Sequence, residues 1–394
     1  MATFYVTPTG SDSNGGTNSY DDSLATINAG IEKCTNAGYP SPGWAFDDNT
    51  VKVYSSASSD ATYYGKHATY ATNTINTINL SKIGVTIEAA GPNNVILDVS
   101  GKSRAAYLNR FSTVRGFVIT ASVASAKTSE DTIAMASGDY GSRIEDCTFD
   151  NCTATNRSTL SPGRTAGGIN AEQYEGWTKR CTFKNLTCVT GFGGATFDGS
   201  VVESLLFYDC TFSQNAVRYH GDSSSPGILR HITVDGCETD RDVYYVGKAH
   251  ITNCIASNCN VTNNSYTFFQ VHSSAEVKNC LAYNNTNLSG NFFGSGDTRS
   301  NCVLDDPGYT DRSGKDFTLQ TSSPAKFTGL SPTRASVGAT GDVYDIASSS
   351  FADPPNMGSY RFTAVVAAAV TEQFTMRGST FTFKGNNNTF TIKG

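Results

Sequence analysis

Apolar residues recur along the chain in short strand-like segments that polar turn residues separate. The recurring unit is a polar residue, a Cys or Ile, two or three residues of strand character, and then Asn or Cys. Recurrence at a fixed period is typical of repeat architectures. The Cys or Ile of each unit lies at positions 147, 181, 210, 232, 254, 280 and 302, in steps of 34, 29, 22, 22, 26 and 22 residues.

The length of the repeat predicts a right-handed parallel β-helix. A coil of three short strands and three turns needs about the shortest of these steps, and a longer step indicates an insertion at a turn. A second apolar strand recurs between the anchors, for example at 194–197, 216–219 and 242–245. Strands of neighbouring coils would stack about 4.8 Å apart, so that like residues form columns along the axis. We therefore expect an all-β chain.

The repeat also predicts the state of the eleven cysteines, most of which fall at the same inward position. Buried free thiols behave as small apolar side chains. A disulfide between Cys147 and Cys152, five residues apart around one strand, would have unfavourable geometry, and no spacing typical of zinc sites occurs. We expect one buried column of free thiols, with Ile232 in the same place, made of Cys147, Cys181, Cys210, Cys254, Cys280 and Cys302.

Both ends of a β-helix expose core and unpaired strands, so both must be covered. Leu24, Ile27, Ile31 and Cys34 recur at helical spacing after Asp22-Ser23, a candidate N-cap. We expect a short helix that covers the N-terminal end. The predicted organisation is an N-terminal cap (1–50), β-helix coils (51–317), a closing segment (318–362), and a linker with a short strand repeat (363–394).

The last residues form a small β module of their own. A five-residue unit that begins Phe-Thr and ends with Arg or Lys and Gly occurs at 374–378, 381–385 and 390–394. Three such strands bury too little apolar surface to be stable alone. They must pack on the β-helix or on another chain, and we expect residues 371–394 to mediate assembly with other protein chains, as a homo-oligomer or in a particle.

Two segments resemble proteins of known architecture. Residues 4–17, followed by Ala25-Thr26-Ile27, resemble the opening of bacterial and viral right-handed β-helix proteins of the pectate-lyase-like superfamily. Residues 305–325 resemble the segment that ends their helix, and residues 357–362 are similar to their closing strand. The resemblance implies the architecture over residues 4 to 362. It leaves the activity open, because the superfamily includes lyases, hydrolases and phage tailspikes.

Composition and charge exclude several classes of protein. Charged residues make up 16% of the chain, the net charge is −6, and no Lys/Arg cluster occurs, so nucleic-acid binding is not expected. The apolar run at 365–370 is too short to span a bilayer. The first five residues lack the basic and apolar regions of a signal peptide. We expect an extracellular or virion-surface protein whose leader was removed or which leaves its cell by another route.

The richest candidate site is Arg218, His220 and Asp222, with Asp198 one coil earlier and Arg241 one coil later. The resemblance implies that a lyase would need a base and commonly calcium, the only candidate cofactor, whereas a hydrolase needs two carboxylates. Asp198 and Asp222 both follow the second strand, so we expect them to stack. His220, Arg218 or Arg241 would act as the base or clamp an acidic sugar. The same residues are also ordinary turn residues.

Two classes of function remain open. The preferred one is a structural or receptor-binding appendage protein of tailspike, fibre or decoration type that engages surface carbohydrate, as the apparent lack of a signal peptide, the low charge and the C-terminal strand repeat indicate. The alternative is a secreted polysaccharide lyase or glycoside hydrolase that acts on acidic polysaccharide. The superfamily resemblance and the acidic patch near Asp222 favour that alternative. In both, the expected partner is a polysaccharide.

Overall fold

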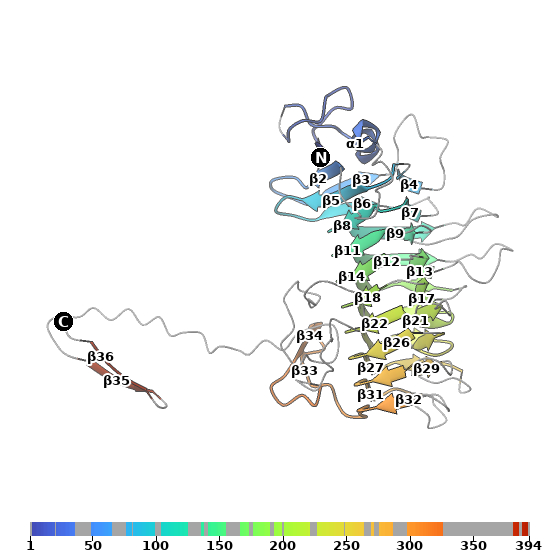
Figure 1. Cartoon of the computed structure of the whole chain (residues 1–394), viewed down its shortest axis with the longest axis vertical. Coiled ribbons are helices and arrows are strands. Elements are labelled where there is room, and N and C mark those ends of the chain that lie inside the picture. The colour runs from blue at the N-terminus through green and yellow to red at the C-terminus, as the bar shows by residue number, and fades with distance from the viewer. Residues whose placement is uncertain are drawn as a thin grey trace, which may run out of the picture. The chain divides into compact units, whose positions relative to one another are not determined.

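The computed structural model describes two compact units, Met1–Phe362 and Thr363–Gly394. The described residues are 2–19, 21–35, 49–64, 76–80, 82–98, 104–124, 135–137, 141–154, 166–172, 176–189, 193–198, 201–220, 227–247, 249–263, 269–271, 276–286, 298–325, 381–385 and 388–392. In the first unit, short strands stack in successive coils along one axis (Figure 1). No helix among the described residues is long and apolar enough to cross a membrane.

Three parallel sheets run along the axis, and we number them in the order in which the chain visits them. Sheet 1 contains β1 (Ala2–Val6), β2 (Asn49–Tyr54), β5 (Val85–Ala90), β8 (Thr113–Arg115), β11 (Arg143–Glu145), β14 (Trp177–Lys179), β18 (Val201–Glu203), β22 (Gly227–Arg230), β26 (Ala249–Thr252), β30 (Glu276–Lys278) and β32 (Thr298–Ser300). Sheet 3 contains β4 (Asn76–Asn79), β7 (Arg104–Leu108), β10 (Met135–Ser137), β13 (Ala166–Glu172), β17 (Gly193–Asp198), β21 (Asn215–His220), β25 (Tyr244–Val246) and β29 (Phe269–Val271).

Sheet 2 divides into two arms, because β12 pairs with both strands of the coil that follows it. Before the division it contains β3 (Ala61–Tyr64), β6 (Val95–Asp98), β9 (Val118–Ala124) and β12 (Thr148–Ala154). The first arm continues with β15 (Thr182–Lys184), β19 (Leu206–Tyr208), β23 (Thr233–Asp235), β27 (Ile255–Ser257) and β31 (Leu281–Tyr283). The second arm continues with β16 (Thr187–Cys188), β20 (Thr211–Phe212), β24 (Glu238–Thr239) and β28 (Asn260–Val261). The predicted all-β parallel β-helix is confirmed.

Two corners of each coil are built by one residue with a left-handed backbone. The corner after sheet 1 has positive φ at Asp146, Arg180, Ser204, His231, Asn253, Asn279 and Asn301. The corner between the arms of sheet 2 has positive φ at Asn151, Asn185, Asp209, Gly236, Asn258 and Asn284. Asn, Asp and Gly adopt this conformation most readily. This preference explains why polar residues begin and end each unit of the sequence repeat.

The residue after each corner points into the core, and nine of the eleven cysteines therefore form two columns. The register places Leu205 beside Cys181, because Thr182 pairs with Leu206. The first column is Cys147, Cys181, Leu205, Ile232, Cys254, Cys280 and Cys302. The second is Cys152, Leu186, Cys210, Cys237 and Cys259. The prediction of a single column was wrong for Cys210, because Leu205 occupies that coil's place in the first column.

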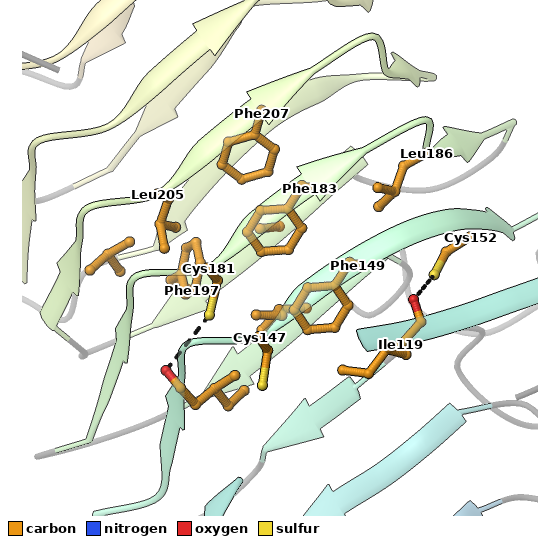
Figure 2. Close-up of a cluster of buried hydrophobic side chains, with 14 of the residues drawn as sticks. Ile119, Cys147, Phe149, Cys152, Cys181, Phe183, Leu186, Phe197, Leu205 and Phe207 are labelled. Atoms are coloured by element: carbon orange, nitrogen blue, oxygen red, sulfur yellow. Dashed lines mark hydrogen bonds between the residues drawn. The ribbon is translucent and has the colours of Figure 1, made fainter. Parts of the chain in front are cut away.

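Figure 2 shows how these columns fit the interior: Cys147 and Cys181 lie beside the stacked rings of Phe149, Phe183 and Phe207. All eleven cysteines of the chain are free thiols; ten are buried, and Cys302 is partly buried. Each thiol in the columns contacts a main-chain carbonyl, as Cys152 Sγ contacts the Ile119 oxygen at 3.4 Å. The expectation of buried free thiols is met.

We expect the thiols to be unreactive in the folded protein and to react once it unfolds. Burial excludes the reagent, and it disfavours the thiolate that carries the reaction. Titration with a thiol reagent in denaturant, without reductant, should find eleven thiols per chain. The same titration of native protein should find fewer than two. A count near zero in denaturant would mean disulfides and would contradict this prediction.

The N-terminal helix begins later than the sequence predicted. α1 spans Ile27–Lys33, and its N-cap is Thr26, whose Oγ1 accepts a hydrogen bond from the Ala29 N–H at 3.2 Å. Asp22-Ser23 was expected there, but the Asp22 carboxylate accepts from the Gly15 N–H at 2.6 Å instead. The helix packs in the same core cluster as β1 and β2. A Cβ on Gly30 would lie 2.7 Å from Val51 Cγ1, so this close approach requires glycine.

A hairpin after the last described coil folds back over sheet 2. β33 (Tyr309–Asp311) and β34 (Asp316–Leu319) pair antiparallel, and the predicted boundary at residue 317 falls inside β34. We call residues 309–319 the clasp. It packs on the outer side chains of the first arm of sheet 2. The resulting second apolar cluster contains Leu206, Ile255, Leu281, Tyr309, Phe317, Leu319 and Ala325.

Polar contacts fix the clasp at its centre. The buried Asp235 carboxylate accepts hydrogen bonds from Arg312 Nε at 2.7 Å and Ser257 Oγ at 2.7 Å. Tyr309 Oη lies 3.0 Å from Ser257 Oγ, and Lys315 forms an ion pair with Asp209. The clasp therefore covers the outer face of the first arm of sheet 2 from β19 to β31.

The second unit contains an antiparallel hairpin of β35 (Phe381–Gly385) and β36 (Asn388–Ile392). Its register places Phe381 opposite Ile392 and Phe383 opposite Phe390. Two of the three predicted tail strands thus pair with each other, whereas 374–378 lies outside the described residues. Assembly through 371–394 stays a prediction.

Candidate functional site

Sheet 3 brings chemically active residues into two rows across neighbouring coils. The first, which we call the end row, is Glu172 of β13, Asp198 of β17 and His220 of β21, which pair in register. The second, the middle row, is Thr196, Arg218, Tyr245 and Gln270. Between them the alternation of the strands buries residues such as Phe197 and Tyr219 in the core. Successive members of each row are one strand spacing, about 4.8 Å, apart.

Arg218 connects the two rows. Its Nε donates a hydrogen bond to His220 Nε2 at 2.5 Å, and its guanidinium carbon lies 5.0 Å from the centre of the Tyr245 ring. His220 and Tyr245 also face each other, with ring centres 6.1 Å apart. Because His220 Nε2 accepts a hydrogen bond in this arrangement, the imidazole is neutral and its proton is assigned to Nδ1.

The environment of Arg218 lowers the pKa of its guanidinium group. The pKa of the Arg218 guanidinium is lowered to about 10, mainly by burial; Tyr245 raises it and the positive charge of Arg241 lowers it. A partly desolvated cation binds a carboxylate more strongly than a fully hydrated one does. The group is thus suited to bind an anion beside His220.

The strand register places part of the predicted site. Asp198 pairs in register with His220, whereas a stack with Asp222 was expected; Asp222 itself lies outside the described residues. Arg241 precedes β25, and its N–H donates to the Gln214 carbonyl at 3.0 Å. Arg241 therefore lies close enough to act on the charge of Arg218, and it belongs to the corner before the strand.

Sequence reasoning missed Glu172. The residue ends β13 as Asp198 ends β17, and the two pair directly. The signal was present, because Ala171-Glu172 aligns with Phe197-Asp198 when the coils are superimposed. Residues 155–165 and 173–175 lengthen this coil, and the insertion obscured the alignment.

Sheet 1 carries a second set of charged residues that the sequence did not single out. One position of sheet 1, in register from strand to strand, carries side chains whose charge alternates in sign along the axis. We call this position the charge row, and it contains Glu88, Arg115, Glu145, Lys179, Glu203 and Arg230. Arg230 donates two hydrogen bonds to the buried Glu203 carboxylate, at 2.9 and 2.7 Å. Burial lowers the pKa of Lys179, which Glu203 partly offsets. Opposite charges on neighbouring strands stabilise the sheet.

Calcium was the one cofactor considered from sequence. Calcium takes six to eight oxygen ligands, mainly from carboxylates and carbonyls. The described part of the chain contains no group of three His, Cys, Asp or Glu residues that could hold a metal ion.

Comparisons with known proteins find likeness in structure only. No protein-family model matches the sequence, and no curated protein matches it. Solved structures that match include a rhamnogalacturonan lyase, with 14% identity, a TM-score of 0.49, and coverage of 79% of this chain and 91% of that one. The pectate lyase Pel9A matches with 12% identity, a TM-score of 0.43, and coverage of 92% and 97%.

A GH136 lacto-N-biosidase from Eubacterium ramulus also matches, with 9% identity, a TM-score of 0.34, and coverage of 77% of this chain and 67% of that one. At these identities and scores, the assignment of the fold rests on the strand pairing of the chain itself. By that pairing, this chain is a right-handed parallel β-helix protein.

Proposed function

We propose that the chain binds an acidic polysaccharide across the outer face of sheet 3 and cleaves a glycosidic bond at the end row. The observation that supports this is the register of Glu172, Asp198 and His220, which brings two carboxyl residues and a neutral imidazole to successive strands. Arg218 would hold the sugar carboxylate, and Tyr245 beside it would contact the sugar ring.

The register brings Glu172 and Asp198 to neighbouring strands. In the proposed reaction one of these two carboxyl residues donates a proton to the leaving oxygen. The other, or His220, can accept a proton on the opposite side of the reaction. A pair of carboxyl groups suits hydrolysis, whereas His220 as the base suits elimination.

Asp198→Asn should lower the rate of cleavage by about 10²–10⁴-fold, because it removes the ionisable group at the centre of the end row. The measurement is the formation of new reducing ends and, separately, of unsaturated ends from a panel of uronate polymers. Asp240→Asn is the matched control, since Asp240 is exposed and binds Thr262 Oγ1 at 3.0 Å. It should cleave like the wild-type protein.

The type of new chain end decides the reaction. Unsaturated ends would identify elimination, and reducing ends alone would identify hydrolysis. Wild-type protein that binds the polymers but forms neither type of end would contradict cleavage. That result would favour the appendage function, for which the separate C-terminal hairpin is the supporting observation.

A further inference from the structure

The corner between sheet 3 and sheet 1 brings a second group of residues next to the end row. Glu172 ends β13, and Trp177 begins β14 after residues 173–176. The residue that begins each of these strands of sheet 1 therefore follows the end row around this corner. In register with Trp177 lie Arg143 of β11 and then Thr113 of β8.

Arg143 is held flat against the Trp177 indole. Its guanidinium carbon lies 3.8 Å from the ring centre, the distance of a stacked cation–π pair. The indole is itself fixed, because Trp177 Nε1 donates a hydrogen bond to Glu145. A guanidinium oriented in this way loses little further entropy when it binds a planar carboxylate.

Two neighbouring groups lack a hydrogen-bond partner. Thr113 is 3% exposed, and neither its Oγ1 nor Arg115 Nε has a partner among the described residues, although both atoms are buried. Arg115 reaches Glu88 only through its terminal nitrogen, at 3.5 Å. A buried donor without an acceptor is costly, and an external carboxylate would satisfy both groups.

The nearest carboxylate of the protein is already bound. Glu145 accepts from Trp177 and lies 3.6 Å from Arg180. Arg180 also forms a two-pronged contact with Asp146, at 2.6 and 2.9 Å. The negative charge of Glu145 is thus balanced on its far side, away from β8.

We propose that Arg143, Arg115 and Thr113, with Trp177 as the support of Arg143, form a subsite for the carboxylate of a uronate residue of the polysaccharide. This subsite rests on the proposed function, because it lies around the corner from the end row. It selects for acidic over neutral polymer, and it binds a sugar other than the one that is cleaved.

The test is calorimetric titration of the full chain with a uronate oligosaccharide and with the same oligosaccharide after reduction of its carboxyl groups. Wild-type protein should bind the uronate form more tightly, and the difference should shrink in high salt. Arg143→Gln should weaken uronate binding about tenfold or more and leave binding of the reduced form unchanged. Lys33→Gln, an exposed cation of α1, is the charge-matched control and should bind both forms like wild type.

Arg143→Lys separates charge from geometry, because it keeps the charge but cannot form the planar contact; an intermediate affinity supports the subsite. Equal uronate binding by wild type and Arg143→Gln, including no binding by either, overturns it. A failure of the proposed function would look different. The preference for uronate would persist and depend on Arg143, while Asp198→Asn and wild type would both leave the polymer uncut.

Discussion

Phe183→Ala is expected to lower the free energy of unfolding by about 3–5 kcal/mol. Phe183 is fully buried and stacks between Phe149 and Phe207, with ring centres 4.8 and 4.3 Å apart and nearly parallel planes (Figure 2). Each coil of a solenoid is stabilised mainly by its two neighbours. Loss of this ring removes contacts to both, and it leaves a cavity that the rigid ladder of strands cannot fill by collapsing.

Urea unfolding of the purified protein measures this effect. Val189→Ala is the control on the same coil, because Val189 is 56% exposed and its truncation should change the free energy of unfolding by less than about 0.5 kcal/mol. Phe183→Leu should fall between the two. A loss below about 1 kcal/mol for Phe183→Ala would show that the stack contributes little and would contradict this prediction.

The protein should become less stable as the pH rises above about 9. Burial raises the pKa of the Cys259 thiol to about 12 and that of Cys34 to about 11, and it raises the pKa of Cys181, Cys237 and Cys280 well above the ordinary value of 9.0. Above pH 9 the unfolded chain loses these protons while the folded chain keeps them. The unfolded state then binds fewer protons, so stability falls as pH rises.

The size of the effect follows from the number of thiols. At a pH of about 10, each thiol that is ionised in the unfolded chain but protonated in the folded chain costs about 1 kcal/mol, so several such thiols together cost a few kcal/mol. The measurement is the free energy of unfolding at several pH values in the presence of reductant. Cys259→Ala should make the decline above pH 9 shallower by one proton. A stability that is constant from about pH 8 to about pH 10 would contradict the prediction.

The sequence predicted the fold because the repeat and its chemistry agree. Polar residues with left-handed backbone geometry recur at the corners, and an apolar residue follows each of them, so the coil can be identified without a structure. The exact column of a residue could not be read in the same way. Each coil has two similar corners, and the choice between Leu205 and Cys210 depends on pairing between strands, which the sequence does not display.

The repeat also placed part of the candidate site, because it assigns residues to coils. Asp198, Arg218 and His220 were placed on neighbouring coils of one sheet, as found. The register pairs Asp198 with His220, and Asp222, two residues further on, lies outside the described residues, so the expected Asp198–Asp222 stack stays a prediction. Glu172 and Arg143 escaped notice because the segments around them vary in length, so their alignment appears only when the strands are paired.

The fixed corners determine where this protein can change during evolution. From β14 through the second arm of sheet 2, one left-handed residue and one inward residue connect each strand to the next, and an added residue there would displace every column. The connections that enter and leave sheet 3 vary freely in length, from two residues at 213–214 to eleven at 155–165. New loops can therefore be acquired at both edges of sheet 3, where the chain enters and leaves it. A lineage, or a protein engineer, could exchange the recognition loops there while inheriting the rest of the scaffold unchanged.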